Sequence, residues 1–170
     1  MASGFIEATA GELVTLTTTG ASSAAYDGNF GAVAADEGVL LTTHSTKGTS
    51  IGFPTAGAKW SHLEIILRDS AATDPTKHEC KVLLTWDLAG DDICAGPSGT
   101  AVMVPRRTTY TGTGSKYDYM CTVDIDSVFT LPPDGTIDKV FLFVATSMFV
   151  ATTPILVRAR LYWHDLNNKG

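Results

Sequence analysis

One pentapeptide has the pattern of a nucleophilic serine site. The segment "GTSIG", Gly48 to Gly52, matches GxSxG, in which the serine sits on a sharp strand-to-helix turn and a histidine elsewhere in the chain activates it. The residues that follow, "FPTAG", include a proline and a glycine and leave no helical run to complete such a turn. We therefore expect Ser50 to be a loop residue, and a hydrolase ranks last among the functions considered.

Two groups of aspartates have the side chains needed for metal binding or acid–base catalysis. Asp87, Asp91 and Asp92 cluster in "WDLAGDDICAGPSG", and oxygen-rich loops can hold calcium, although this spacing fits no EF-hand. Aspartates also gather in turns because their carboxylates bond to nearby backbone. A calcium site and an ordinary turn are therefore both possible interpretations of this loop. Asp124 and Asp126 have the residue types of a paired acid and base, but alternation along a strand predicts two solvated carboxylates.

Histidine and cysteine spacing favours no metal centre and no cofactor. Cys80, Cys94 and Cys121 are odd in number and lack CxxC or CxxH spacing, which predicts buried thiols rather than a disulfide framework or a zinc site. The histidines lie in separate segments without an HxH or HExxH pair: His44, His62, His78 and His164.

Aromatic and basic residues supply two candidate binding surfaces. Trp60, Trp86 and Trp163, with four of the tyrosines, have the rings of a platform on which sugars stack, although aromatics at strand ends are also common in cores and rims. A carbohydrate-binding β-sandwich module, with a glycan as its partner, is therefore the alternative function. Arg106 and Arg107 precede "TTYTGTGSKYDY", which is either a mobile hairpin loop or a protein interface.

These side chains must be positioned by β-strands, because hydrophobic residues recur with a period of two. In "WSHLEIILRD", Leu63, Ile65 and Leu67 alternate with polar residues, as in a half-buried strand. The apolar run from Val140 to Ala145 predicts a strand buried on both faces. About eight strands without a long helix favour an all-β antiparallel two-sheet sandwich, most simply a jelly roll. The expected core comprises Leu63, Ile65, Leu67, Val82, Leu84, Val123, Ile125, Val140, Leu142, Val144, Val157 and Leu161.

The chain is expected to form one domain preceded by an arm. Residues 1–12 are rich in Gly, Ala and Ser around Phe5 and Ile6, which predicts an N-terminal arm that docks on a neighbour, and residues 13–170 predict a single β-sandwich domain. With 170 residues, 44% hydrophobic and 18% charged, the composition is typical of a globular chain. The net charge of −6 argues against sequence-independent binding to nucleic acid or to an anionic membrane.

The N-terminal sequence and the cysteines bear on where the protein is made. "MASGFIEATAGELV" has no basic region followed by an apolar one, and no run of about 18 apolar residues is present to span a bilayer. Together with unpaired cysteines, this predicts synthesis and folding in a reducing cytosol.

The last strand, "ILVRARLYWHDLNNKG", places Arg158 and Arg160 on one face together with Tyr162 and His164. Two arginines on one face need water, carboxylates or another chain around them. One alternative is a solvated ladder of cross-strand ion pairs, each worth less than about 1 kcal/mol; the other is an interface with a second protein, where Arg and Tyr are enriched. The carboxylates considered for the ladder are Glu64, Asp124 and Asp126.

The assembled pattern resembles the small jelly-roll structural proteins of tailed bacteriophages, the cement or decoration proteins that sit as trimers on the outside of capsids. The resemblance lies in the run of strands and in "WSHLEIILRD", "VLLTWDLAGDD", "LPPDGTIDKVFLFV" and "VRARLYWHD". It implies a non-enzymatic virion protein made in the host cytoplasm, a homotrimer, whose N-terminal arm or loop clamps the major capsid protein or another virion protein. The candidate partner-binding residues are Phe5, Ile6, Arg106, Arg107, Arg158, Arg160 and Tyr162.

Overall fold

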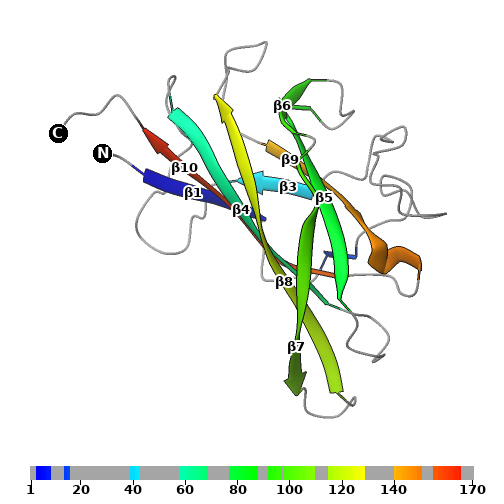
Figure 1. Ribbon diagram of the computed structural model, residues 1–170. Coiled ribbons are helices and arrows are strands. Elements are labelled where there is room, and N and C mark those ends of the chain that lie inside the picture. Colours follow the sequence, from blue (N-terminus) through cyan, green and yellow to red (C-terminus); the bar gives the residue numbers. More distant parts are fainter. Residues whose placement is uncertain are drawn as a thin grey trace.

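The structure is a computed structural model that describes residues 3–8, 14–15, 39–42, 58–68, 77–87, 92–96, 98–109, 115–128, 140–150 and 155–165. Its elements (Figure 1) are β1 (Ser3–Ala8), β2 (Val14–Thr15), β3 (Val39–Thr42), β4 (Ala58–Arg68), β5 (His78–Thr85), β6 (Ile93–Ala95), β7 (Ala101–Thr109), β8 (Ser115–Val128), β9 (Val140–Thr146), a 3-10 turn η1 (Ser147–Val150) and β10 (Ile155–Asp165). Within these ranges, no helix is long and apolar enough to cross a membrane.

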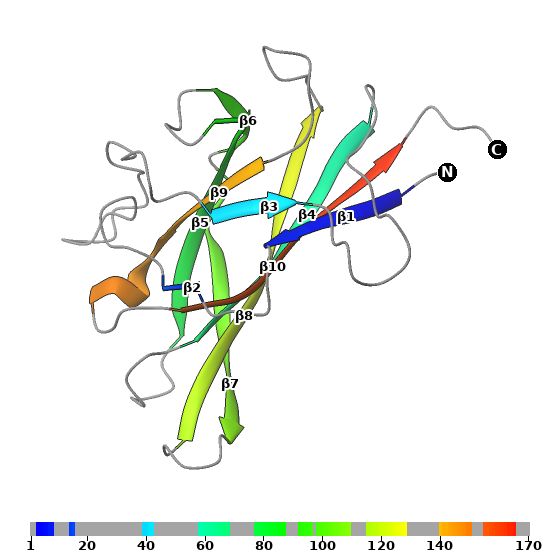
Figure 2. The ribbon, with the colours of Figure 1, turned by 180° about the vertical axis from the view of Figure 1, so that it is seen from behind.

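The strands form one antiparallel sheet whose hydrogen bonding closes into a ring. Their order is β1-β3-β9-β5-β7-β8-β4-β10-β2, β6 pairs with β5, and β1 also pairs with β10. Four of the pairings are nested along the chain, since β1 pairs with β10, β3 with β9, β4 with β8 and β5 with β7. From behind (Figure 2), β3 and β9 lie on the opposite side of the molecule from β8. The all-β antiparallel fold is confirmed.

Alternation along the strands fills the interior of the ring. In β4, Leu63, Ile65 and Leu67 are fully buried, while the residues between them are partly exposed. In β9, Phe143 and Ala145 are buried as well as the residues that alternate with them, so this strand is buried on both faces as its apolar run predicts. Eleven of the twelve expected core positions are confirmed: Leu63, Ile65, Leu67, Val82, Leu84, Val123, Ile125, Val140, Leu142, Val144 and Leu161.

Val157 is the exception, and a β-bulge explains it. The register between β10 and β4 shifts between Leu156 and Arg158, which leaves Val157 as the extra residue. Leu156 and Ala159 are buried on either side of the shift, whereas Val157 is only partly buried. Strict alternation therefore predicts the wrong inward residue at the start of β10 and the correct ones after the bulge.

Residues 3–8 are a strand of the sheet, which corrects the prediction of an arm for this segment. β1 pairs with β10 from Ser3 opposite His164 to Glu7 opposite Arg160, and it pairs with β3 on its other side. Ile6 is fully buried and belongs to the core cluster. Gly and Ala hide the signal in the sequence, because the two neighbouring strands, and not local propensity, hold this segment extended. The other residues of the predicted arm, 1–2 and 9–12, lie outside the described ranges.

Replacing Ile6 tests whether β1 closes the ring. We expect Ile6→Ala to lower the free energy of unfolding by about 2 to 5 kcal/mol, because it empties a fully buried site. Ile65→Ala, at a fully buried site in β4, should cost a similar amount, and Ile93→Ala, at a site 55% exposed, should cost much less. Urea unfolding measures all three. An Ile6→Ala protein as stable as the Ile93→Ala protein would instead favour the prediction that this segment is an arm outside the core.

Candidate functional site

Five of the candidate residues lie on the outer face of β7, β8, β4, β10 and β1, which are consecutive in the ring: Phe5, Arg106, Arg158, Arg160 and Tyr162. Because side chains alternate across a strand, the residues between the core positions point outward. The registers align them in rows that cross the strands: Arg160 lies opposite Glu7 on one side and Glu64 on the other, and Met120 lies opposite Ile66 and Val104. This surface is called the outer face below.

Arg160 is held by its own chain. Its Nε donates a 2.8 Å hydrogen bond to Oε2 of Glu7, and the two side chains are 23% and 10% exposed. Its guanidinium carbon lies 4.7 Å from the ring centroid of Phe5, a cation–π geometry. The hydrogen bond to Glu7 raises the pKa of Arg160. Glu7 is not among the carboxylates predicted to pair with the arginines, because the sequence predicts an arm for residues 1–12.

Arg158 is held more loosely. Its Nη2 lies 3.8 Å from Oε2 of Glu64, and both side chains are more than a third exposed. The same carboxylate oxygen accepts a 3.0 Å hydrogen bond from the hydroxyl of Tyr162. Of the predicted ladder carboxylates, Glu64 therefore forms one cross-strand ion pair, with Arg158. Asp124 lies opposite His62, away from both arginines in register, and the side chain of Asp126 is outside the described part of the structure.

Arg106 lies at the far end of the outer face. It is exposed and opposite Asp118, whose Oδ1 accepts a 2.9 Å hydrogen bond from Nε of Arg68. The backbone of Arg107 pairs with that of Tyr117, but its side chain is not among those described. Most of the "TTYTGTGSKYDY" loop also lies outside the described ranges, so its role as an interface stays a prediction.

An apolar patch lies between these charged rows. It consists of Val102 and Val104 on β7, Met120 on β8 and Ile66 on β4. Val104 and Ile66 both lie opposite Met120, so the three side chains form a continuous row. Val104 is 55% exposed and Met120 37%, and Val102 extends the patch along β7. Beside it, a pocket of about 240 Å³ is lined by Glu64, Ile65, Ile66, Met120, Cys121, Thr122 and Arg158.

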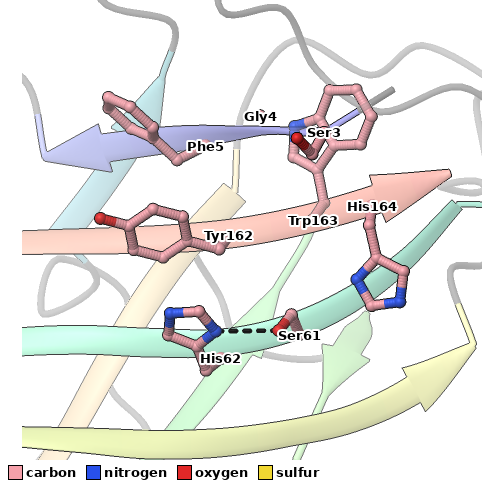
Figure 3. A pocket seen from close by; sticks show the side chains of 8 residues that line it. All are labelled: Ser3, Gly4, Phe5, Ser61, His62, Tyr162, Trp163 and His164. Carbon is pink, nitrogen blue, oxygen red and sulfur yellow. Dashed lines mark hydrogen bonds between the residues drawn. The ribbon is translucent and has the colours of Figure 1, made fainter. Parts of the chain in front are cut away.

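A second, larger pocket lies at the other end of the outer face (Figure 3). It has a volume of about 390 Å³ and takes residues from β1, β4 and β10. Tyr162 lies between Phe5 and His62, with ring centroids 5.5 Å and 4.5 Å away, and the His62 ring is within 15° of parallel to it. The pocket is called the aromatic pocket, and its lining is Ser3, Gly4, Phe5, Ser61, His62, Tyr162, Trp163 and His164.

A bulge aims two polar residues of β4 into the aromatic pocket. Trp60 and Leu63 are both buried although they are three residues apart, so Ser61 and His62 both stay partly exposed between them. The register of β4 shifts here against both of its neighbours. Ser61 Oγ and His62 Nδ1 share a 2.8 Å hydrogen bond. Among the described residues nothing else hydrogen-bonds His62, whereas a serine nucleophile needs a third group to orient its histidine.

Trp163 belongs to the buried core cluster and also lines the aromatic pocket. Trp60 and Trp86 are buried in the core, where the indole N–H of Trp60 donates to Cys94 Sγ at 3.1 Å. A Cβ on Gly4 would lie 2.9 Å from the Trp163 ring, so a glycine is required where β1 passes this indole. Two members of the predicted sugar platform, Trp163 and Tyr162, thus line the aromatic pocket together with Phe5, which the sequence pattern does not single out for that role.

The remaining chemical motifs form no site in the described ranges. Asp87 Oδ1 accepts a 2.8 Å hydrogen bond from the backbone of Asp92, which is the turn-forming role of such aspartates. No group of three potential metal ligands occurs among the residues described. Ser50, His44 and Asp91 lie outside them.

Comparison with protein-family models, curated proteins and solved structures finds no match for this chain. A function must therefore be inferred from its own residues and geometry.

The two arginines of β10 allow a matched test of the ladder. We expect Arg160→Ala to lower the free energy of unfolding by about 1.5 to 3 kcal/mol, because it leaves the mostly buried Glu7 carboxylate without this charged hydrogen bond. Arg158→Ala should cost less than about 1 kcal/mol, because its ion pair is longer and exposed. Chemical denaturation of both variants, with Glu7→Gln completing a double-mutant cycle, measures the difference. Equal losses of unfolding free energy in the two variants would mean that the Arg160–Glu7 pair is no more stabilising than the exposed Arg158–Glu64 pair.

Proposed function

We propose that this chain is a non-enzymatic structural protein of a virion, a cement or decoration protein that binds the major capsid protein as a homotrimer on the capsid surface. It would be synthesised in the host cytoplasm and act through protein–protein contacts alone. The observation that carries the proposal is the apolar patch on the outer face, and the nested strand pairing supports it.

The strand order supports the fold that the resemblance implies. In a jelly roll the first strand pairs with the last, the second with the next to last, and so on inward, and this long hairpin wraps into two four-stranded sheets. The pairings of β1 with β10, β3 with β9, β4 with β8 and β5 with β7 follow that scheme. We propose sheets β1-β10-β4-β8 and β3-β9-β5-β7. Jelly rolls are common in viral capsid proteins.

The apolar patch supports a role in assembly. Valine and methionine side chains that adjoin across strands and face water favour association, because covering them removes apolar surface from solvent. Val104 and Met120 are the most central of these residues, and the exposed Arg106 lies beside them. Aromatic, Met and Arg side chains are enriched in such interfaces. We place the contact between subunits here rather than at Phe5 and Ile6, since Ile6 is buried within the chain.

A carbohydrate-binding module remains the second candidate, and the aromatic pocket favours it. Its volume of about 390 Å³ lies in the range of small-molecule sites, and its lining combines aromatic rings with two histidines and two serines. Glycan-array binding that is lost in Tyr162→Ala and kept in Trp86→Phe would support this candidate. Trp86 is the appropriate control because it lies in the core and away from the pocket.

The proposed interface is tested by charging the patch. We expect the purified protein to be a trimer in solution, and Val104→Asp to weaken the trimer by at least about tenfold, because a carboxylate would be buried in an apolar contact. Ile93→Asp is the matched control, because Ile93 is also 55% exposed but lies on β6, outside the patch. Light scattering across a dilution series measures the molar mass. A wild-type monomer at every concentration would overturn the trimer, and equal effects of both variants would overturn this choice of surface.

A further inference from the structure

Two cysteine sulfurs meet inside the ring. Sγ of Cys80 on β5 and Sγ of Cys121 on β8 lie 3.3 Å apart, although β5 and β8 are not hydrogen-bonded neighbours. A separation this short places the sulfurs in direct contact. Closing it to a disulfide bond requires an approach of roughly 1.3 Å. The sequence offers no hint of the pair, because the two residues belong to separate strands without a spacing motif.

We propose that Cys80 and Cys121 are an oxidation site, at which a peroxide converts the two thiols into a disulfide that ties β5 to β8. Both cysteines are free, with no disulfide between them in the structure described. The reaction of the two thiols does not depend on the proposed structural role, but the time at which the bond would form rests on that role.

The two thiols differ in a way that assigns their roles. Cys80 is fully buried, whereas Cys121 is partly exposed. The hydrogen bond between the two sulfurs raises the pKa of Cys80 and lowers that of Cys121. Because the thiolate is the nucleophile, Cys121 is the sulfur that reacts first, and Cys80 resolves the product.

The oxidation balances with hydrogen peroxide as the only oxidant. The Cys121 thiolate attacks one peroxide oxygen, and the O–O bond breaks to give a sulfenic acid on Cys121. The departing hydroxide leaves as water by taking up the proton that Cys121 lost when it ionised. The Cys80 sulfur then attacks the Cys121 sulfur, the S–O bond breaks, and the second water carries away the Cys80 proton. Two thiols and one peroxide yield one disulfide and two waters.

Cys94 is the internal control. It is buried, receives the indole N–H of Trp60, and has its pKa raised to about 12, chiefly by burial. It therefore has little thiolate at neutral pH and should resist the same oxidant.

The consequence is a covalent link across the interior. The disulfide would close a loop between residues 41 positions apart and join two strands that, in the proposed jelly roll, belong to opposite sheets. A virion protein folds in a reducing cytosol and then persists outside the cell, where disulfides are stable. The bond would thus form after release from the cell and stabilise the folded subunit against unfolding without affecting its folding.

The test uses the full chain, reduced and then treated with hydrogen peroxide. We expect free thiols to fall from three to one, the intact mass to drop by two hydrogens, and peptide mapping to join Cys80 to Cys121. The melting midpoint should rise by about 5 to 10 °C and return on reduction. Cys94→Ala should behave like the wild type, whereas Cys121→Ser and Cys80→Ala should each abolish the mass loss and the thermal shift.

Other products would overturn the proposal. Three free thiols after treatment, oxygen added to Cys121 without loss of the Cys80 thiol, or a bond that involves Cys94 each contradict it. Trimer formation and glycan binding are measured separately in reducing buffer, so failure of the proposed function would leave the disulfide result intact, and the reverse.

Discussion

The pairing of β1 with β10 is the constraint on which the rest of the structure depends. An open sheet exposes unpaired N–H and C=O groups along its edge strands, and β1 joins the ends of this sheet by bonding to β10 on one side and β3 on the other. The same six-residue strand buries Ile6 in the core, places Glu7 against Arg160 and contributes Phe5 to the aromatic pocket. Core, charged ladder and pocket therefore all depend on the segment with the weakest strand signal in the sequence.

Periodicity predicts the strands that carry their own apolar pattern, and it fails where a partner strand sets the geometry. The alternation of Leu63, Ile65 and Leu67 is visible without any neighbour, so β4 and its core residues could be predicted. The bulge at Val157 is invisible to such a pattern, because the extra residue is fixed by the register with β4. β1 is missed for a related reason: Ile6 is its one β-branched residue, and the two flanking strands hold the segment extended.

The outer face could be predicted in part from β10 alone. Two arginines at alternate positions need water, carboxylates or another chain around them, and Glu64 is predictable as a partner because β4 is recognisable as a strand. As a strand, "SGFIEA" would place Phe5 and Glu7 on the outward face by alternation, and Glu7 would then be the predicted partner of Arg160. The aromatic pocket is not predictable from such a pattern, because its lining comes from β1, β4 and β10. The bulge that directs Ser61 and His62 into the pocket is also set by the register between strands.

These contacts divide the outer face into parts with different capacities for binding. Arg160 is held by the Glu7 carboxylate and the Phe5 ring, so reorienting it toward a partner would break contacts within the chain. Arg158 keeps a longer, exposed ion pair and adjoins the apolar patch through Ile66, its neighbour in register. A partner that covers Val104 and Met120 would remove water from around Arg158 and strengthen any carboxylate contact made there, because charges interact more strongly at low dielectric. In the proposed interface, the contribution of β10 would thus come from Arg158 and the adjoining patch, whereas Arg160 stabilises the fold.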